Sequence, residues 1–330
     1  MKNNPLLKPL SIGLFCFLAI FGLTFFLHLK NKKEPEKVLT LEDVINSSSM
    51  EEARKEHKIE DFTPIQTYKH LEGYEEDVLI IRSFKRDDIP SFLGVNVETL
   101  ETVVFPEEAL AGATNPEMAF EETRFYKLVN TDNPVKKLDS KGYALTIDLC
   151  EKPRKKERHF ETRLFDFLEK ISLERQTVVP VGIAVSVAWI KQEPSAFERI
   201  VQMRDSGTLN VTWINHSATH PVNKGKFLTE SNTDFTMEVL ATEKYLLERG
   251  EIPSVFFRFP GLVYNQDLLT KLKEFSLIPL DANTWLAKGK KIQDGSIILI
   301  HGNGNEPEGI DIFLKFFQKT QPEFISIQKI

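Results

Sequence analysis

The chain of 330 residues is long enough for about two domains, and its 41% hydrophobic and 27% charged residues are ordinary for a globular protein. Its formal net charge of −6, with no stripe of Lys and Arg between aromatic residues, gives no reason to expect nucleic-acid binding. The two cysteines, Cys16 and Cys150, are too few for a disulfide framework.

Residues 10–27, LSIGLFCFLAIFGLTFFL, form an apolar run without a charge. As a helix rising about 1.5 Å per residue, the run would be about 27 Å long, enough to cross the core of a bilayer. No A-x-A cleavage pattern follows it, so the sequence predicts an uncleaved single-pass anchor over residues 1–30, with a buried soluble helix as the alternative. Lysines flank the run on both sides, and their number alone does not decide the side of the membrane.

Residues 31–75 are polar and charged, and they are predicted to form a juxtamembrane linker with one short helix around Ser49–His57. Residues 76–140 are predicted to form a small accessory region. Its expected elements are strands at Val78–Phe84 and Val103–Phe105 and a helical turn at Glu107–Ala111.

From Lys141 to the end, strands and helices alternate, which predicts an α/β fold with a parallel sheet, either open or closed into a barrel. The expected strands are Tyr143–Asp148, Val178–Val187, Val211–Ile214, Val255–Phe257, Leu277–Leu280 and Ile297–Ile300. The expected helices are His159–Ile171, Ala196–Met203, Phe235–Glu248, Gln266–Phe275 and Ile310–Lys319.

Ionisable residues follow these strands where each one ends. They are Asp148, the pair His216 and His220, Arg258, Asp281 and His301. A single such residue is usually a cap or a turn former, but the carboxyl ends of parallel strands meet on one face, where α/β folds build their sites. Two imidazoles four residues apart can bind one metal ion if their loop makes a helical turn.

The order of these motifs resembles that of the polysaccharide deacetylases with the NodB homology fold, carbohydrate esterase family 4. The matching motifs are TID at Asp148, HSATH at His216 and His220, RFPG at Arg258, DANTW at Asp281 and LIH at His301. The resemblance covers about residues 141–330 and implies a distorted (β/α) barrel that binds a divalent metal, usually zinc.

The resemblance also implies a role for each residue. Asp148 would be the general base, oriented by Arg258, and His301 the general acid, partnered by Asp281. His216 and His220 would bind the metal. Trp285 would help to wall the pocket near His301. Independently of the resemblance, the Gly/Asn residues after His301 match no phosphate-binding fingerprint and predict a tight turn at the pocket rim.

One position departs from the family pattern. The family usually has a second aspartate after the first, as a metal ligand, and this chain has Leu149 there. Two histidines alone make a weak zinc site, since catalytic zinc normally has three protein ligands. Asp148 itself, Cys150 or Glu151 could be the third ligand.

The resemblance and the predicted anchor together imply a membrane-bound deacetylase that acts on an N-acetylated or O-acetylated cell-envelope polysaccharide, with its catalytic domain periplasmic or extracellular. Because of Leu149, a non-catalytic glycan-binding or envelope-scaffold protein is the alternative.

Overall fold

The computed structural model describes residues 57–71, 77–151, 160–320 and 323–330. The predicted anchor (residues 1–30) and the predicted linker up to residue 56 lie outside these ranges. Within the described ranges, no helix is long and apolar enough to cross a membrane.

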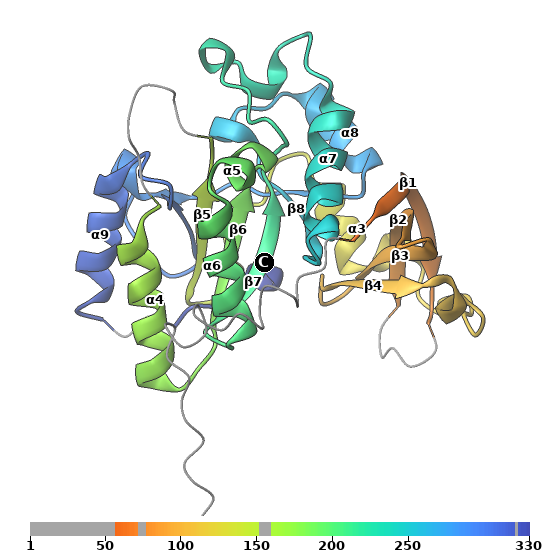
Figure 1. Cartoon of the computed structure of the whole chain (residues 1–330), viewed down its shortest axis with the longest axis horizontal. Coiled ribbons are helices and arrows are strands. Elements are labelled where there is room, and N and C mark those ends of the chain that lie inside the picture. Colours follow the sequence, from red (N-terminus) through yellow and green to blue (C-terminus); the bar gives the residue numbers. More distant parts are fainter. Residues whose placement is uncertain (1–56, 72–76, 152–159, 321–322) are drawn as a thin grey trace, which may run out of the picture. The chain divides into compact units, whose positions relative to one another are not determined.

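A four-stranded antiparallel sheet precedes the main domain, and its strands are neighbours in chain order (Figure 1). The strands are β1 (Ile59–Lys69), β2 (Val78–Arg86), β3 (Ile89–Asn96) and β4 (Thr102–Pro106). The turn between β2 and β3 is the pair Asp87–Asp88, both with positive φ, as tight hairpins with a right-handed twist require. The accessory region is therefore organised as a β-meander.

Strand β1 lies within the segment that the sequence predicts to be linker, so that prediction is wrong for residues 59–69. The strand is at the edge of the sheet and most of its side chains are partly or fully exposed. Its sequence therefore lacks the apolar alternation of a half-buried strand and resembles a polar connection.

The antiparallel sheet packs on the main domain through a common core and a buried ion pair. Leu93 and Val95 belong to the same apolar cluster as Phe256 and Ile278 of the main domain. Arg82 of β2 donates from Nε and Nη2 to the two carboxylate oxygens of Glu243, over 2.6 and 2.8 Å. Both side chains of this pair are buried.

The main domain contains a parallel sheet of seven strands, as the alternation of strands and helices predicts. Its spatial order is β10-β11-β5-β6-β7-β8-β9. The strands are β5 (Tyr143–Leu149), β6 (Val179–Val185), β7 (Leu209–Asn215), β8 (Pro253–Phe257), β9 (Ile278–Pro279), β10 (Thr284–Trp285) and β11 (Ser296–His301). Most of their residues are buried, which explains their nearly continuous apolar sequences.

Helices connect the strands, and α4, α6 and α9 contact β6, β7 and β11 respectively. The helices are α3 (Arg124–Val129), α4 (Thr162–Arg175), α5 (Val187–Gln192), α6 (Pro194–Asp205), α7 (Phe235–Glu248), α8 (Gln266–Glu274) and α9 (Pro307–Phe317). Side-chain caps start several of them: Ser186, Asp234 and Asn265 each accept a hydrogen bond from a first-turn amide.

The sheet ends at β9 and β10, and the segment that precedes β5 bridges the two sides of this opening. Val135 pairs with Leu280 just after β9, and Lys137 pairs with Ser296 of β11. The amide of Leu138 donates to the carbonyl of Gly295 over 3.0 Å. The predicted barrel is thus an incompletely hydrogen-bonded one, whose gap is lined by residues of the accessory region.

Candidate active site

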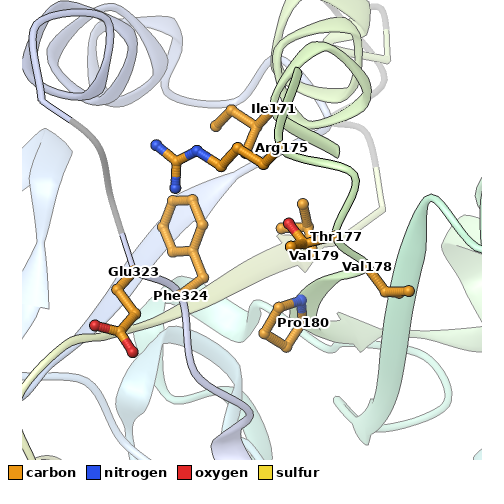
Figure 2. Close-up of a pocket in the computed structure, with 8 residues that line it drawn as sticks. All are labelled: Ile171, Arg175, Thr177, Val178, Val179, Pro180, Glu323 and Phe324. Atoms are coloured by element: carbon orange, nitrogen blue, oxygen red, sulfur yellow. The ribbon is translucent and has the colours of Figure 1, made fainter. Parts of the chain in front are cut away.

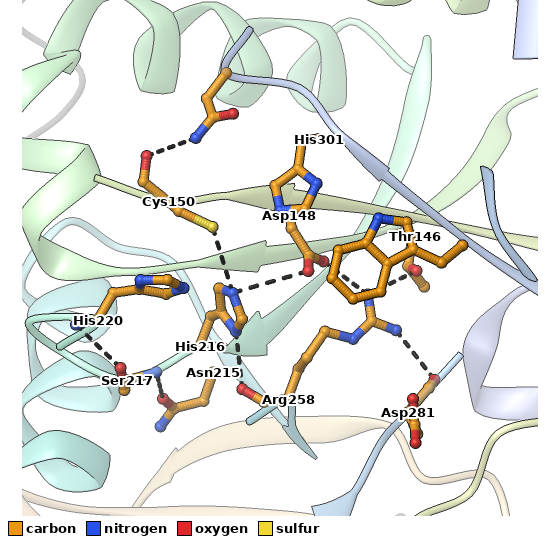
Figure 3. A network of polar contacts seen from close by, with 12 residues as sticks. Thr146, Asp148, Cys150, Asn215, His216, Ser217, His220, Arg258, Asp281 and His301 are labelled. Carbon is orange, nitrogen blue, oxygen red and sulfur yellow. Dashed lines mark hydrogen bonds and ion pairs between the residues drawn. The ribbon is translucent and has the colours of Figure 1, made fainter. Parts of the chain in front are cut away.

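Five neighbouring parallel strands, β11, β5, β6, β7 and β8, end on the same edge of the sheet. All of them except β6 carry a predicted site residue at this end, and Figure 3 shows these side chains. Asp148 and His301 are directly paired in the register of β5 and β11. His216 follows β7 and Arg258 follows β8. The structure therefore brings these side chains together, as the strand-end pattern predicts.

Asp148 is buried and forms an ion pair with Arg258. Its Oδ1 accepts a hydrogen bond of 2.7 Å from Nη1 of Arg258, and its Oδ2 lies 3.8 Å from Nε2 of His216. Burial by itself raises the pKa of Asp148, but the charges of Arg258, His216 and His301 outweigh it and lower the pKa below its usual value. Asp148 is thus a carboxylate at neutral pH.

Arg258 is itself held by three elements. Its Nη1 also donates to the hydroxyl of Thr146 over 2.7 Å, and its Nη2 donates to the carbonyl of Asp281 over 3.2 Å. Its backbone amide donates to the carbonyl of Asn215 at the end of β7. This network orients the guanidinium plane toward Asp148.

The two histidines meet through an irregular loop and not through the helical turn that their spacing suggests. Ser217 and His220 both have positive φ, and the ring centroids of His216 and His220 are 4.8 Å apart. Two buried polar residues shape this loop. Asn215 accepts from the amide of Ser217, and Glu238 of α7 accepts from the amide and hydroxyl of Thr219.

The nitrogen atoms of both imidazoles are in the form that binds metals. Nδ1 of His216 donates to the carbonyl of Arg258 over 2.8 Å, so the lone pair lies on Nε2. Burial lowers the pKa of His216, and burial together with the charge of His216 lowers the pKa of His220 to about 3. Both rings are therefore neutral near pH 7.

Cys150, one of the three alternatives for the third metal ligand, lies next to the two histidines. Its Sγ is 3.5 Å from Nε2 of His216, and one ligand atom from each of Cys150, His216 and His220 lies within 4.8 Å of the others. Burial raises the pKa of the Cys150 thiol well above its ordinary value. Glu151 points elsewhere: it accepts a hydrogen bond from the Gln192 side chain at an exposed position.

His301 is paired with Glu306, not with the predicted partner Asp281. Nδ1 of His301 lies 2.9 Å from Oε2 of Glu306, an ion-pair distance, although the ring N–H is not aligned for a hydrogen bond. The indole of Trp285 donates to the same oxygen over 2.6 Å, and its ring lies 5.9 Å from that of His301. Trp285 is thus beside His301, where the family resemblance expects it.

The electrostatics of Glu306 follow from these neighbours. Burial raises its pKa, but the contacts with His301 and Trp285 and the nearby charge of Lys288 lower it to about 2. Asp281 differs: its Oδ1 accepts a hydrogen bond from the amide of Ala282, and burial raises its pKa. Glu306 meets His301 because the loop that leaves β11 after His301 brings the start of α9 back to it.

Three residues of the site were not singled out from the sequence: Asn215, Glu238 and Glu306. Asn215 had a usable signal, since it is the first polar residue after an apolar strand. Glu238 had none, because an acidic residue in the first turn of a helix is usually explained by the helix dipole. Glu306 follows a Gly/Asn turn, and only the path of that turn brings it back to His301.

A separate pocket of about 350 Å³ lies near the start of β6, the opposite end of the parallel strands (Figure 2). Arg175, Val178 and Phe324 are among the residues that line it. It contains none of the predicted site residues.

No model of a known protein family matches the sequence. Among solved structures, the chain is similar to a family 4 carbohydrate esterase from Bacillus anthracis, with 20% identity over 62% of this chain and 89% of that one and a TM-score of 0.46. It is similar to a family 4 pseudoenzyme from the same organism, with 12% identity over 85% and 92% of the two chains and a TM-score of 0.45. It is also similar to the peptidoglycan deacetylase PdaC from Bacillus subtilis, with 18% identity over 58% and 90% and a TM-score of 0.41.

Proposed function

We propose that this chain is a metal-dependent hydrolase that removes N-acetyl or O-acetyl groups from a cell-envelope polysaccharide. The observation that carries the proposal is the position of Asp148. This carboxylate is fixed by Arg258 on one oxygen, faces His216 with the other, and is paired in strand register with His301. A base, an acid and a cation site therefore surround one point at the edge of the sheet.

The side chains present fit a divalent cation. His216 and His220 are neutral, and their ring centroids lie 4.8 Å apart. Nδ1 of His216 already donates to the backbone carbonyl of Arg258. Such an outer contact is typical of metal-binding histidines. A cation bound there would supply Lewis acidity toward an acetyl carbonyl and toward water.

Asp148 has the properties of a general base for attack by water. It is ionised, and Arg258 holds it in one orientation, so Oδ2 can accept the proton of a water molecule between it and the acetyl group. Neighbouring Thr146 keeps the Arg258 guanidinium in place. The carboxylate therefore needs no rearrangement before the reaction.

His301 has the position of a general acid. Its Nδ1 faces Glu306, which leaves Nε2 as the nitrogen that can protonate the departing amine or alcohol. The half-buried Trp285 lies beside the imidazole, with the two rings tilted to each other. Base and acid come from adjacent strands at paired positions, so the two groups can act on the same scissile bond.

The substrate class and location come from the motif resemblance and from the apolar residues 10–27. The motifs point to an acetylated glycan, and an N-terminal anchor would keep the domain near the cell envelope. The non-catalytic alternative rested on the missing ligand at Leu149. Since Cys150 offers a donor beside His216, we do not favour that alternative.

The test is release of acetate from N-acetylglucosamine oligomers by the purified full-length protein. We expect release that a chelator abolishes and added Zn²⁺ or Co²⁺ restores. Asp148→Asn should lose at least about 100-fold in rate, the usual contribution of a general base, and retain its metal. Absence of acetate release from the wild type, with and without these metals, would refute the proposal.

A further inference from the structure

We infer that Cys150 is the third protein ligand of the metal centre, so that the site binds Zn²⁺ or Co²⁺ through one thiolate and two imidazoles. This inference deepens the proposed function and shares with it the assumption that a cation is bound. It concerns the residue that takes over from the missing carboxylate at Leu149.

The donor atoms of Cys150 and His216 are separated as such a centre requires. Zinc binds sulfur at about 2.3 Å and imidazole nitrogen at about 2.0–2.1 Å, so a tetrahedral angle places the two donors about 3.5 Å apart. Sγ of Cys150 is 3.5 Å from Nε2 of His216. His220 completes the group within 4.8 Å, and Figure 3 shows the thiol and both rings turned toward one another.

The alternation of side chains along β5 explains why Cys150, and not Leu149, faces the histidines. Successive strand residues point to opposite faces. Asp148 points to Arg258 and His216, so Leu149 points to the opposite face of the sheet. On that face the side chains of Leu149, Ile147 and Phe165 lie next to Gly302. Residue 150 returns to the face of Asp148.

The backbone around Cys150 is fixed by the loop after β11. The side-chain amide of Asn303 donates to the carbonyl of Cys150 over 2.7 Å, and the amide of Gly302 donates to the carbonyl of Asp148 over 3.1 Å. Asn303 is fully buried. The loop after β11 thus fixes the backbone that carries the thiol.

The two other candidate ligands have different contacts. Glu151 binds Gln192 at an exposed position, and Asp148 has one oxygen committed to Arg258. Cys150 is buried, with 3% exposure, and free of any disulfide. Thiolate donors favour zinc and cobalt over magnesium, calcium and manganese, which prefer oxygen ligands.

Binding exchanges one proton for one metal–sulfur bond. The thiol S–H bond breaks, its electron pair forms the bond to the cation, and the proton leaves to solvent, with no change of oxidation state. A coordinated thiol is deprotonated by the ion itself, so the buried thiol needs no separate base.

The test is the absorption spectrum of the full-length protein after its metal is removed and replaced with Co²⁺. We expect one Co²⁺ per chain and a near-ultraviolet thiolate-to-cobalt charge-transfer band. Cys150→Ser should abolish the band and weaken metal binding by more than about 100-fold, since loss of even an outer-shell contact costs 10–100-fold. Cys150→Asp should bind metal without the band.

Cys16→Ser is the matched control, because it removes the only other thiol of the chain and should leave the band unchanged. Circular dichroism checks that each variant is folded, and the wild-type spectrum tests the inference even if a variant is not. A band without acetate release would support the inference and refute the proposed function. Bound Co²⁺ without a band, or no bound metal, would overturn the inference, and acetate release would then test the function independently.

Discussion

Asp148 and Arg258 form a buried pair in which each group compensates the burial of the other. The charge of Arg258 offsets the burial that would otherwise keep Asp148 protonated, and Thr146 and the carbonyl of Asp281 satisfy other guanidinium hydrogens. Such a pair is sensitive to geometry as well as charge, since the planar guanidinium donates in several fixed directions.

Arg258→Lys should therefore lower acetate release by about 10–100-fold while metal content stays unchanged, because an ammonium keeps the charge but cannot contact Asp148, Thr146 and Asp281 together. Steady-state kinetics and metal analysis measure the two effects. Arg163→Lys is the control, because Arg163 of α4 forms an exposed ion pair with Asp311 of α9. Equal rates for Arg258→Lys and the wild type would show that the guanidinium group of Arg258 does not orient the Asp148 carboxylate.

Glu306 is the second residue whose surroundings set its behaviour. Its folded pKa of about 2 is below the ordinary value of 4.5, so its ionised form stabilises the fold above pH 4.5. This stabilisation should be lost as the pH falls from about 4.5 through 2. Denaturant unfolding of the wild type across that range should show the loss, and Glu306→Gln should lack this part of it.

Trp285→Phe is the matched variant, because it keeps an aromatic ring beside His301 and removes the hydrogen bond to Glu306. It should move the acid transition of the wild type toward higher pH. If Glu306→Gln and the wild type had the same dependence on pH, the pairing with His301 would not contribute to stability. Reduced acetate release by Glu306→Gln would identify Glu306 as a positioning residue for His301.

At the scale of elements, the close approach of β11 and β5 places His301 beside Asp148. Gly302 directly follows β11, and a Cβ at this position would lie 2.6 Å from Cγ2 of Ile147 and 3.0 Å from Cδ2 of Leu149. The first contact is shorter than real Cβ atoms make, and the second is unusually tight. Glycine is therefore needed here for its small size.

Gly302→Ala should push the end of β11 away from β5, destabilise the protein by about 1–3 kcal/mol as overpacking does, and lower acetate release. Gly309→Ala, in α9, is the control, since its nearest contact would be an ordinary 3.4 Å to the amide of Ala287. Chemical denaturation measures the first effect and kinetics the second. Equal stability of the two variants would contradict the close approach.

At the scale of the whole molecule, the pair of Arg82 and Glu243 fastens the antiparallel sheet to α7. Arg82 also donates from Nη1 to the carbonyls of Ile81 and Phe275, so its hydrogen bonds join three segments. Burial raises the pKa of Glu243 despite the nearby Arg82. The attraction between Arg82 and Glu243 therefore does not fully offset the free-energy cost of removing the two charges from water, as is common for buried ion pairs.

Glu243→Gln should destabilise the protein by about 3 kcal/mol, because it leaves the Arg82 charge buried without a partner. The double variant Arg82→Met/Glu243→Met should recover at least half of this loss, since it removes both charges. Lys85→Ala, at the exposed ion pair with Asp61, is the control and should leave the unfolding midpoint unchanged. A double variant no more stable than Glu243→Gln would refute this account.

Local patterns in the sequence were sufficient for much of the fold and for the meeting of most candidate site residues at one edge of the sheet. Buried parallel strands are continuous apolar runs, so β5, β7 and β11 were predicted together with the polar residues at their ends. Those ends share one edge of the sheet, which explains why Asp148, His216 and His301 were expected together. Helix α7 was predicted with its observed bounds, because an apolar face and a closing glycine define it locally.

Contacts between distant segments required the tertiary structure. Strand β1 is an exposed edge whose pairing with β2 no local pattern reveals, and residues 135–138 bridge the sheet through backbone hydrogen bonds that any sequence could make. The choice of Glu306 over Asp281 depends on the path of a turn. The position of Cys150 follows partly from the sequence and partly from the tertiary structure. Strand alternation places it on the same face as Asp148, but only the folded loop after β7 shows that His216 lies next to its sulfur atom.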